Sequence, residues 1–351
     1  MHLTLDDYSL RTAPLATTLP EFLQERVYSS YHVLVDENTE KHCLPALQKV
    51  APQLDLHPIV IPAGEAYKHL ATCETIWQQL MQQGAARQSL LINLGGGVIG
   101  DMGGFCAATF KRGMNFLQIP TTLLSQVDAS IGGKLGVDFG GIKNSIGLFR
   151  NPAAVLIDPA FYRTLPAEEV RSGFAEIIKH ALIHDAEQWA KLQRIQNLSK
   201  VNWKDFLVPS LQIKRTIVQE DPFERGLRKA LNFGHTIGHA VEGHALQHGT
   251  PMLHGEAVAL GIVCESFLSH RAGLLPEEEL TGIVDFVRHL YPDHRFERSL
   301  YPDFFQRMRQ DKKNRGTEIN FTLIGPIGTC HIDRTASVAD IEAALDFYRI
   351  G

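Results

Sequence analysis

The stretch LLINLGGGVIGD, residues 90–101, runs an apolar segment directly into a group of glycines and closes with an aspartate. Its apolar part is typical of a buried strand. Gly95, Gly96, Gly97 and Gly100 would let the backbone approach a ligand closely, and a helix starting there would offer free N–H groups to a phosphate. The stretch therefore predicts a strand, a tight turn and a helix, which is the repeating unit of a parallel α/β sheet.

The glycine spacing alone does not establish a nucleotide site. Gly95, Gly97 and Gly100 match the pattern GxGxxG of dinucleotide-binding turns. The acidic residue expected about 20 positions later is absent near Ile119 and Pro120. A tight turn without a ligand therefore stays an open alternative for this motif.

Short apolar runs alternate with helical patterns over the whole first half of the chain, which favours an α/β domain with a mostly parallel sheet. The runs are YHVLVDEN (31–38), HPIVIPAG (57–64), NFLQIPTT (115–122) and AAVLIDP (153–159). After Pro166 the apolar residues recur at helical spacing. Near the end, EINFTLIGPIGTCHI (318–332) predicts a small hairpin that turns at Gly325 and Pro326. We expect a Rossmann-like α/β domain over residues 1–165 and a mainly helical domain over residues 166–351.

Composition excludes several classes of protein. The chain has 351 residues, of which 44% are hydrophobic and 21% charged, as in ordinary globular proteins. A net charge of -5 argues against a general nucleic-acid binder. We expect no membrane span, because no run approaches the roughly 20 apolar residues required, and no secretory signal is visible. The five cysteines are scattered singly, which predicts reduced thiols and a cytoplasmic protein.

A second polar group lies in a glycine-rich context at residues 111–147. Lysine and arginine beside flexible backbone are suited to holding anionic groups. Solvated surface charges are the alternative for any one of these residues. The group contains Arg112, Asp128, Lys134, Lys143 and Asn144.

Five histidines crowd into NFGHTIGHAVEGHALQHGTPMLHGEAV, residues 232–258, which invites a metal ion. His235 and His239 lie four apart and so share one helix face, as do Glu176 and His180 on an earlier helix. Spacing therefore proposes too many ligands, and a structural role is the alternative for each single histidine. His254 precedes a predicted helix start. We expect the remaining two, His244 and His248, to face solvent.

Several motifs in order resemble 3-dehydroquinate synthases over about residues 63–261. They are GGGVIGD, KRG, PTTLLSQVDASIGGK, GIKNSIG, FAEIIKHALI, LRKALNFGHTIGHAVE and LHGEAVALG, with weaker echoes at VLVDEN and MRQDKKNRG. The resemblance implies a Rossmann-like NAD domain and a helical metal-binding domain with the active site between them. It also implies a homodimer.

The resemblance assigns the metal, usually zinc and sometimes cobalt, to Glu176, His235 and His254. It takes His239 out of the metal shell, since the histidine at that place in the family helps to bind the substrate phosphate. His235 is then the one member of the four-apart pair that binds metal.

The resemblance also implies the other binding residues. Those expected around NAD are Asp36, Ala63, Gly64, Glu65, Ala66, Tyr67, Lys68, Gly97, Val98, Ile99, Gly100, Asp101, Thr121, Thr122, Lys134, Lys143, Phe161, Tyr162, Arg163 and Thr164. Those expected at the substrate or in catalysis are Lys134, Lys143, Asn144, Asp128, Lys179, Lys214, Arg228, Asn232, His239, and Lys312 or Lys313. Arg112 is expected to reach the phosphate site of the neighbouring subunit.

By resemblance, the reaction converts 3-deoxy-D-arabino-heptulosonate 7-phosphate, a sugar phosphate, to 3-dehydroquinate and phosphate. It combines transient oxidation by NAD, phosphate elimination, re-reduction and aldol closure, in the shikimate pathway of aromatic amino acid biosynthesis. Three rival functions stay open: a related sugar phosphate cyclase, a metal-dependent polyol dehydrogenase, and a non-catalytic sugar-phosphate binder. The set Lys214, Arg228, Asn232 and His239 suits a substrate with a carboxylate and favours the synthase.

Overall fold

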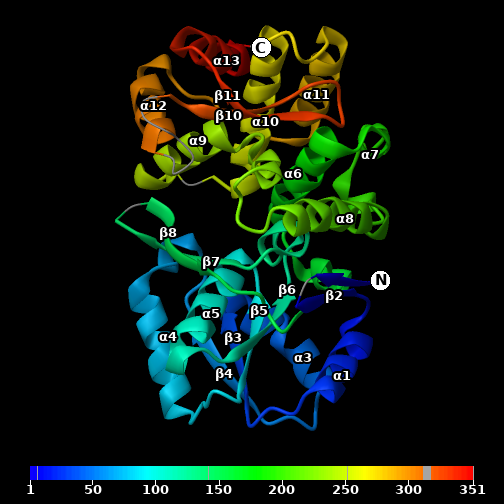
Figure 1. The fold of residues 1–351 in the computed structure, drawn as a ribbon, viewed down its shortest axis with the longest axis vertical. Coiled ribbons are helices and arrows are strands. Elements are labelled where there is room, and N and C mark those ends of the chain that lie inside the picture. Colours follow the sequence, from blue (N-terminus) through cyan, green and yellow to red (C-terminus); the bar gives the residue numbers. More distant parts are fainter. Residues whose placement is uncertain (6, 141, 251, 311–317, 351) are drawn as a thin grey trace. The chain divides into compact units, whose positions relative to one another are not determined.

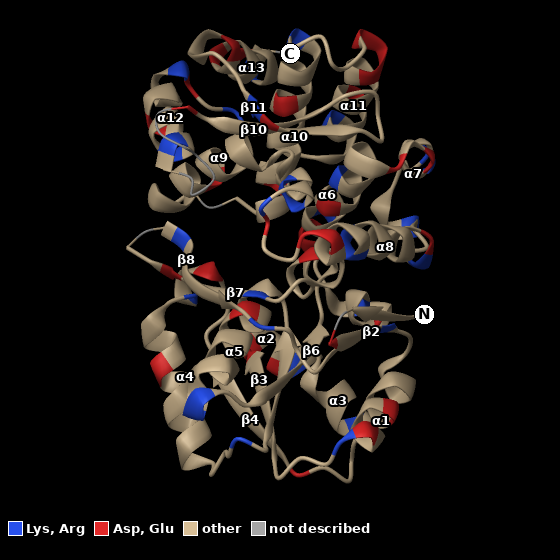
Figure 2. Ribbon diagram, viewed as in Figure 1, with Lys and Arg blue, Asp and Glu red and all other residues tan. Residues whose placement is uncertain are grey.

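The computed structural model describes residues 1–5, 7–140, 142–250, 252–310 and 318–350. The chain divides into two units, Met1–Pro166 and Ala167–Gly351, here called the N-terminal and C-terminal units. Acidic and basic residues are interspersed in both (Figure 2). Within the described ranges, no helix is long and apolar enough to cross a lipid bilayer.

The N-terminal unit is built on a seven-stranded sheet (Figure 1). The strand order is β1-β2-β9-β6-β5-β3-β4. All neighbours pair in parallel except β1 and β2, so the predicted mostly parallel α/β domain is confirmed. The strands are β1 (His2–Leu5), β2 (Tyr8–Thr12), β3 (Tyr31–Asp36), β4 (Leu56–Ile61), β5 (Leu90–Gly95), β6 (Asn115–Pro120) and β9 (Ala154–Ile157).

Helices cover both faces of this sheet. Alternate side chains of each strand point to opposite faces, and apolar side chains on both faces pack against these helices. In β3, Val33 and Val35 pack with α1 (Leu15–Glu25) and α3 (Leu44–Val50), and α2 (Glu37–His42) precedes α3. Leu34, between them, packs with α4 (Leu70–Gln82) and α5 (Gly97–Thr109) on the other face. The continuous apolar runs of the sequence are therefore strands buried on both sides.

Helix α5 lies unusually close to its neighbours because glycines occupy its inner face. A Cβ atom on Gly103 would lie 2.0 Å from Oδ1 of Asn93, and one on Gly104 would lie 2.3 Å from Cδ2 of Leu135. Leu135 belongs to an antiparallel hairpin, β7 (Lys134–Phe139) and β8 (Ile142–Phe149), that the sequence analysis did not anticipate. The hairpin thus packs against α5.

The C-terminal unit is mainly helical, as predicted, and α10 lies at its centre. Helix α10 is buried on nearly all sides, which is typical of a helix surrounded by its neighbours. The predicted hairpin is confirmed by the antiparallel pair β10 (Asn320–Ile324) and β11 (Cys330–Thr335). The helices are α6 (Ala167–His184), α7 (Ala186–Leu192), α8 (Lys204–Glu220), α9 (His235–Gln247), α10 (His254–Arg271), α11 (Glu277–Leu290), α12 (Tyr301–Gln310) and α13 (Val338–Ile350).

Candidate functional site

Most of the residues predicted to bind NAD lie at or just after the carboxyl ends of strands in the N-terminal unit. The carboxyl ends of parallel strands meet at one edge of a sheet, which is where nucleotides bind in open α/β folds. Asp36 ends β3, and Ala63–Lys68 follow β4. Gly97–Asp101 form the first turn of α5 after β5, Thr121 and Thr122 follow β6, and Phe161–Thr164 follow β9.

The glycine turn lies at a topological switch point of the sheet. Strand β3 pairs with β4 on one side and with β5 on the other. The chain leaves β3 toward the face covered by α3 and leaves β5 toward the face covered by α5. Connections that diverge in this way open a crevice at the strand ends. Gly95–Gly97 lie where the two connections diverge, and no side chain caps the start of α5, so its first N–H groups suit a phosphate.

Lys68 is the centre of a polar cluster at this edge. Its side chain is 5% exposed, and Nζ lies 2.6 Å from Oδ2 of Asp101 and 2.7 Å from Oδ1 of Asn144. Burial lowers the pKa of Lys68, but the carboxylates of Asp101 and Glu65 outweigh it and raise the pKa overall. Nζ of Lys143 lies 3.6 Å from Oε1 of Glu65. The structure therefore brings together five residues that the sequence analysis placed at NAD or substrate.

Other predicted NAD residues have structural roles as well. Asp36 caps α2, accepting the N–H of Thr39 at 2.8 Å. Ile99 and Phe161 are buried in the two hydrophobic clusters that flank the sheet, so their side chains stabilise the fold and only their backbone can face a ligand. Tyr162 donates its hydroxyl hydrogen to Oε1 of Gln126.

Arg112 is exposed on a turn with an unusual backbone. Lys111, Arg112 and Gly113 have φ angles of 47°, 66° and 113°. Two consecutive non-glycine residues in the left-handed region are strained, and such strain often accompanies function. The Lys111 ammonium donates to the Ala85 carbonyl at 2.6 Å, which anchors the turn.

Lys134 and Asp128 also lie in the N-terminal unit. Lys134 begins β7, and Asp128 lies in a π-helical turn, Ser125–Ala129. Turns of this type are rare and occur often at functional sites.

In the C-terminal unit, three predicted metal ligands converge. Oε1 of Glu176, on α6, lies 3.5 Å from Nε2 of His235 and 3.6 Å from Nε2 of His254. A tetrahedral zinc ion with bonds of 2.0–2.2 Å separates its ligand atoms by about 3.3–3.6 Å. The distances from Glu176 to the two imidazoles therefore match those around such an ion. His239 belongs to the same group, since ligand atoms of His235, His239 and His254 lie within 4.8 Å of one another.

His235 and His254 each have a second partner at the other ring nitrogen, Nδ1. Nδ1 of His254 lies 3.3 Å from Oε2 of Glu242, and Nδ1 of His235 lies 3.1 Å from the Phe233 carbonyl oxygen. Partners of this kind fix the tautomer and the orientation of metal-binding imidazoles. Burial lowers the pKa of His254, but Glu242 and Glu176 outweigh it and raise the pKa to about 10. The same negative field would attract a divalent cation.

Glu242 was missed by the sequence analysis. It lies on α9 with its side chain 5% exposed. A signal was available, because Glu242 is seven residues after His235 and so shares its helix face.

Close contact between α9 and α10 brings the two histidines together. A Cβ atom on Gly238 would lie 2.7 Å from the carbonyl oxygen of Ala257, and one on Gly261 would lie 1.8 Å from the carbonyl oxygen of Gly234. Only glycine permits this approach of the two backbones. It places His235, the first residue of α9, near His254, the first residue of α10.

Three predicted substrate cations are buried in the same unit. Lys179, Lys214 and Arg228 have exposed fractions of 1%, 4% and 2%. They lie on α6, α8 and the short helix η6 (Leu227–Asn232), which contact one another. Lys179 forms an ion pair with Glu176. Hydrogen bonds from buried cations to an anion are strong, so this group is a candidate site for an anionic substrate.

The loop before η6 holds Arg228 in place. Asp221 accepts the backbone N–H groups of Arg225, Gly226 and Arg228 at 2.7–3.1 Å. The Arg228 guanidinium donates to the Pro222 carbonyl oxygen at 2.6 Å. These hydrogen bonds close the loop on itself and orient Arg228.

Asn232 ends η6 and donates from Nδ2 to Oε1 of Glu224 at 2.9 Å. Glu224 has a φ of 58°, so its backbone is in the left-handed region. Glu224 was not among the predicted site residues.

Three further histidines that the sequence analysis considered, His244, His248 and His180, lie in different surroundings from one another. His248 is exposed, as expected. The expectation for His244 is wrong, because its side chain is 15% exposed and Nδ1 lies 2.7 Å from Oδ2 of Asp303 on α12. His180 is buried, with Nδ1 2.6 Å from Oγ of Ser210. The predictions for Lys312 and Lys313 fall outside the described residues.

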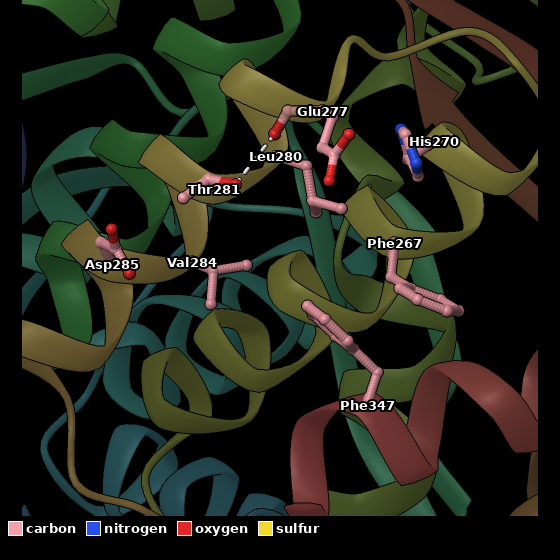
Figure 3. Close-up of a pocket in the computed structure, with 8 residues that line it drawn as sticks. All are labelled: Phe267, His270, Glu277, Leu280, Thr281, Val284, Asp285 and Phe347. Carbon is pink, nitrogen blue, oxygen red and sulfur yellow. Dashed lines mark hydrogen bonds between the residues drawn. The ribbon is translucent and has the colours of Figure 1, made fainter. Parts of the chain in front are cut away.

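A cavity of about 290 Å³ lies elsewhere in the C-terminal unit, where rings from α10 and α13 stack 4.5 Å apart beside α11 (Figure 3). None of the predicted site residues lines it. Its lining residues are Phe267, His270, Glu277, Leu280, Thr281, Val284, Asp285 and Phe347.

The sequence matches two family models in succession. Residues 58–172 match 3-dehydroquinate synthase N-terminal, and residues 173–314 match 3-dehydroquinate synthase C-terminal. A 3-dehydroquinate synthase of Parabacteroides distasonis is 44% identical over 340 residues, covering 95% of this chain and 96% of the relative. One of Sulfurovum sp. is 44% identical over 295 residues, covering 84% and 82%.

Solved structures of related enzymes share the fold. A 2-epi-5-epi-valiolone synthase of Streptomyces hygroscopicus, with NAD+ and Zn2+ bound, is 29% identical with a TM-score of 0.87, covering 99% of this chain and 98% of that one. An iron-containing alcohol dehydrogenase of Thermotoga maritima is 15% identical with a TM-score of 0.67, covering 99% and 98%, and shows a shared fold alone. Both family models and the curated relatives agree with the motifs. The chain belongs to the 3-dehydroquinate synthase family.

Proposed function

We propose that the chain converts 3-deoxy-D-arabino-heptulosonate 7-phosphate to 3-dehydroquinate and phosphate, as a lyase that uses NAD and a divalent metal ion. The observation that carries this proposal is the convergence of Glu176, His235 and His254, in which Oε1 of Glu176 lies at distances typical of a tetrahedral ion from both imidazoles. Three protein ligands leave a coordination position open for substrate.

The two cofactors would be held by different units. In this proposal the N-terminal unit binds NAD at the crevice beside Gly95–Gly97, and the C-terminal unit holds zinc or cobalt. When bound, NAD+ accepts and returns a hydride while the metal ion lowers the pKa of a coordinated hydroxyl. The relative with NAD+ and Zn2+ bound supports both assignments.

The chain's own cations would bind the charged ends of the substrate. A substrate with a carboxylate and a phosphate requires several positive charges. Lys179, Lys214 and Arg228 are buried, so their hydrogen bonds to an anion would be strong. His239 is exposed beside the metal-binding histidines, which suits contact with the substrate phosphate. We assign Lys134, Lys143 and Asn144 to substrate binding as well.

One assay tests the activity. The chain is given the heptulosonate phosphate, a divalent metal and a small amount of NAD+, and phosphate release and absorbance at the NADH band are followed together. We expect many phosphates per NAD and no steady accumulation of NADH. Continuous NADH formation would indicate a dehydrogenase and contradict the proposal.

A related sugar phosphate cyclase is the second candidate function, because the 2-epi-5-epi-valiolone synthase covers 99% of the chain with a TM-score of 0.87. The two candidates differ in whether the substrate carries a carboxylate. Preference for a heptulose phosphate lacking that carboxylate would favour the second candidate.

We also propose a homodimer in which Arg112 serves the neighbouring subunit. The exposed, strained turn that presents Arg112 supports this role. Mixing an Arg112→Ala chain with a His235→Ala chain should restore activity, because one site of each mixed dimer would be intact. If mixed dimers form and the mixture is still as inactive as each variant alone, the proposed role of Arg112 is contradicted.

The five free cysteines support a cytoplasmic location.

A further inference from the structure

Glu265 is a fully buried carboxylate that the proposed reaction does not use. It lies on α10 in the apolar run ALGIVCESFLS and is 0% exposed. A buried charge is costly unless it is hydrogen-bonded. Each oxygen of Glu265 accepts a backbone N–H: Oε2 from Gly234 at 2.7 Å and Oε1 from Ile237 at 3.1 Å.

Both donors belong to the start of α9, where N–H groups have no partner within the helix. The first residue of α9 is the metal-binding histidine His235. A carboxylate at this position is also stabilised by the positive end of the helix dipole. Glu265 therefore holds the backbone on both sides of His235.

One peptide group connects Glu265 to the imidazole. The N–H of Gly234 and the carbonyl of Phe233 belong to the same peptide bond. The N–H donates to Glu265, and the carbonyl oxygen lies 3.1 Å from Nδ1 of His235. A carbonyl can only accept, so Nδ1 carries the hydrogen, and in the neutral imidazole this leaves the lone pair of Nε2, 3.5 Å from Oε1 of Glu176, available to a metal ion.

The peptide group is held rigidly in this orientation. Gly234 has a φ of 78°, and a Cβ on it would lie 2.8 Å from Cγ1 of Ile262. On the other side, the Gly234 carbonyl fits against Gly261. A hydrogen-bonded chain of fixed geometry polarises each member in turn, so the charge of Glu265 would strengthen the carbonyl as an acceptor and the imidazole as a ligand.

We propose that Glu265 is a positioning residue for His235, acting through the Phe233–Gly234 peptide group to orient the imidazole and raise its affinity for the metal ion. This inference rests on the proposed metal site. Glu242 contacts Nδ1 of His254 directly. In this proposal Glu265 has the corresponding role for His235, but a peptide group lies between its carboxylate and the imidazole.

The test compares metal binding by the whole chain and by Glu265→Gln, which has the same shape but no charge and one acceptor fewer. A matched control is Glu279→Gln, since Glu279 also accepts a backbone N–H, from Ile327 at 2.9 Å, but lies on α11. Zinc affinity is measured by competition with a chromophoric chelator, and the cobalt form is examined by visible absorption. We expect Glu265→Gln to bind zinc roughly 10–100-fold more weakly, with a shifted cobalt spectrum, while Glu279→Gln matches the parent.

The outcomes separate the two proposals. A Glu265→Gln chain that binds zinc as tightly as the parent, with the same cobalt spectrum, would overturn the role of Glu265 even if it unfolds more easily. A parent chain that binds no zinc would instead overturn the metal site. If Glu265→Gln does not fold, Glu265→Asp is compared with Glu279→Asp. Weaker zinc binding by Glu265→Asp alone supports the role, and equal binding by both overturns it.

Discussion

Replacing His235 and His239 separately by alanine tests how two histidines on one helix face divide their work. Glu176 is fully buried, and its Oε1 lies 3.5 Å from Nε2 of His235. His239 is exposed at the same cluster. We expect His235→Ala to lose metal and His239→Ala to keep it while losing turnover.

The expected magnitude follows from the number of ligands. Structural zinc sites with four ligands bind zinc with a free energy of roughly 10–16 kcal/mol, or about 2.5–4 kcal/mol per ligand. Loss of His235 should therefore weaken zinc binding by about 10²–10³-fold. His239→Ala should change it by less than about threefold, since a substrate contact adds little to metal affinity. Alanine at this exposed helix position should also keep the helix stable.

The measurement is zinc content per subunit after dialysis, together with chelator competition and phosphate release. Circular dichroism on both variants controls for folding. The reasoning is refuted if His239→Ala loses as much zinc as His235→Ala, because His239 would then be a ligand.

Three further predictions concern stability. Gly261→Ala should destabilise the C-terminal unit by more than about 3 kcal/mol and weaken zinc binding, because its Cβ would lie 1.8 Å from the Gly234 carbonyl oxygen; normal melting would contradict this. Lys68→Met should lower the free energy of unfolding by about 3 kcal/mol, because it leaves the carboxylate of Asp101, whose side chain is only 17% exposed, without its cation. Urea unfolding measures this change, and an unchanged midpoint would count against the prediction. Burial lowers the pKa of His32, so the unfolded state binds a proton more readily and stability should fall below about pH 6.5, by at most about 1.4 kcal/mol per pH unit. His32→Gln should remove that part of the slope between pH 7.5 and 5.5, and equal slopes would contradict the assignment.

The sequence predicted the parts of the fold that depend on local pattern. The buried strand, glycine turn and helix at residues 90–101 are β5 and the start of α5, because apolar runs and glycines determine local backbone conformation. The hairpin at β10 and β11 was likewise visible in its turn residues. The hairpin of β7 and β8 was missed, since its glycine-rich sequence lacks a clear alternating pattern.

The residues of the candidate site, unlike the fold, could not be predicted from local sequence pattern alone. Helical spacing grouped His235 with His239 and Glu176 with His180, and only the resemblance to a family selected His254 and Glu176 as ligands together with His235. Spacing describes neighbours on one helix, whereas Glu176, His235 and His254 come from three helices. Glu265 was missed because no sequence pattern marks the partner of a buried carboxylate, whereas the position of Glu242, seven residues after His235 on α9, was an available signal that was not used.

The sequence by itself determined the two fold classes, the family and the residue types available for chemistry, because these depend on local periodicity and on motifs. Only the tertiary structure decided which donor atoms meet. Gly238 and Gly261 let α9 and α10 approach closely enough to bring His235 and His254 to the same oxygen of Glu176. That distance depends on backbone packing between helices, which no single stretch of sequence specifies.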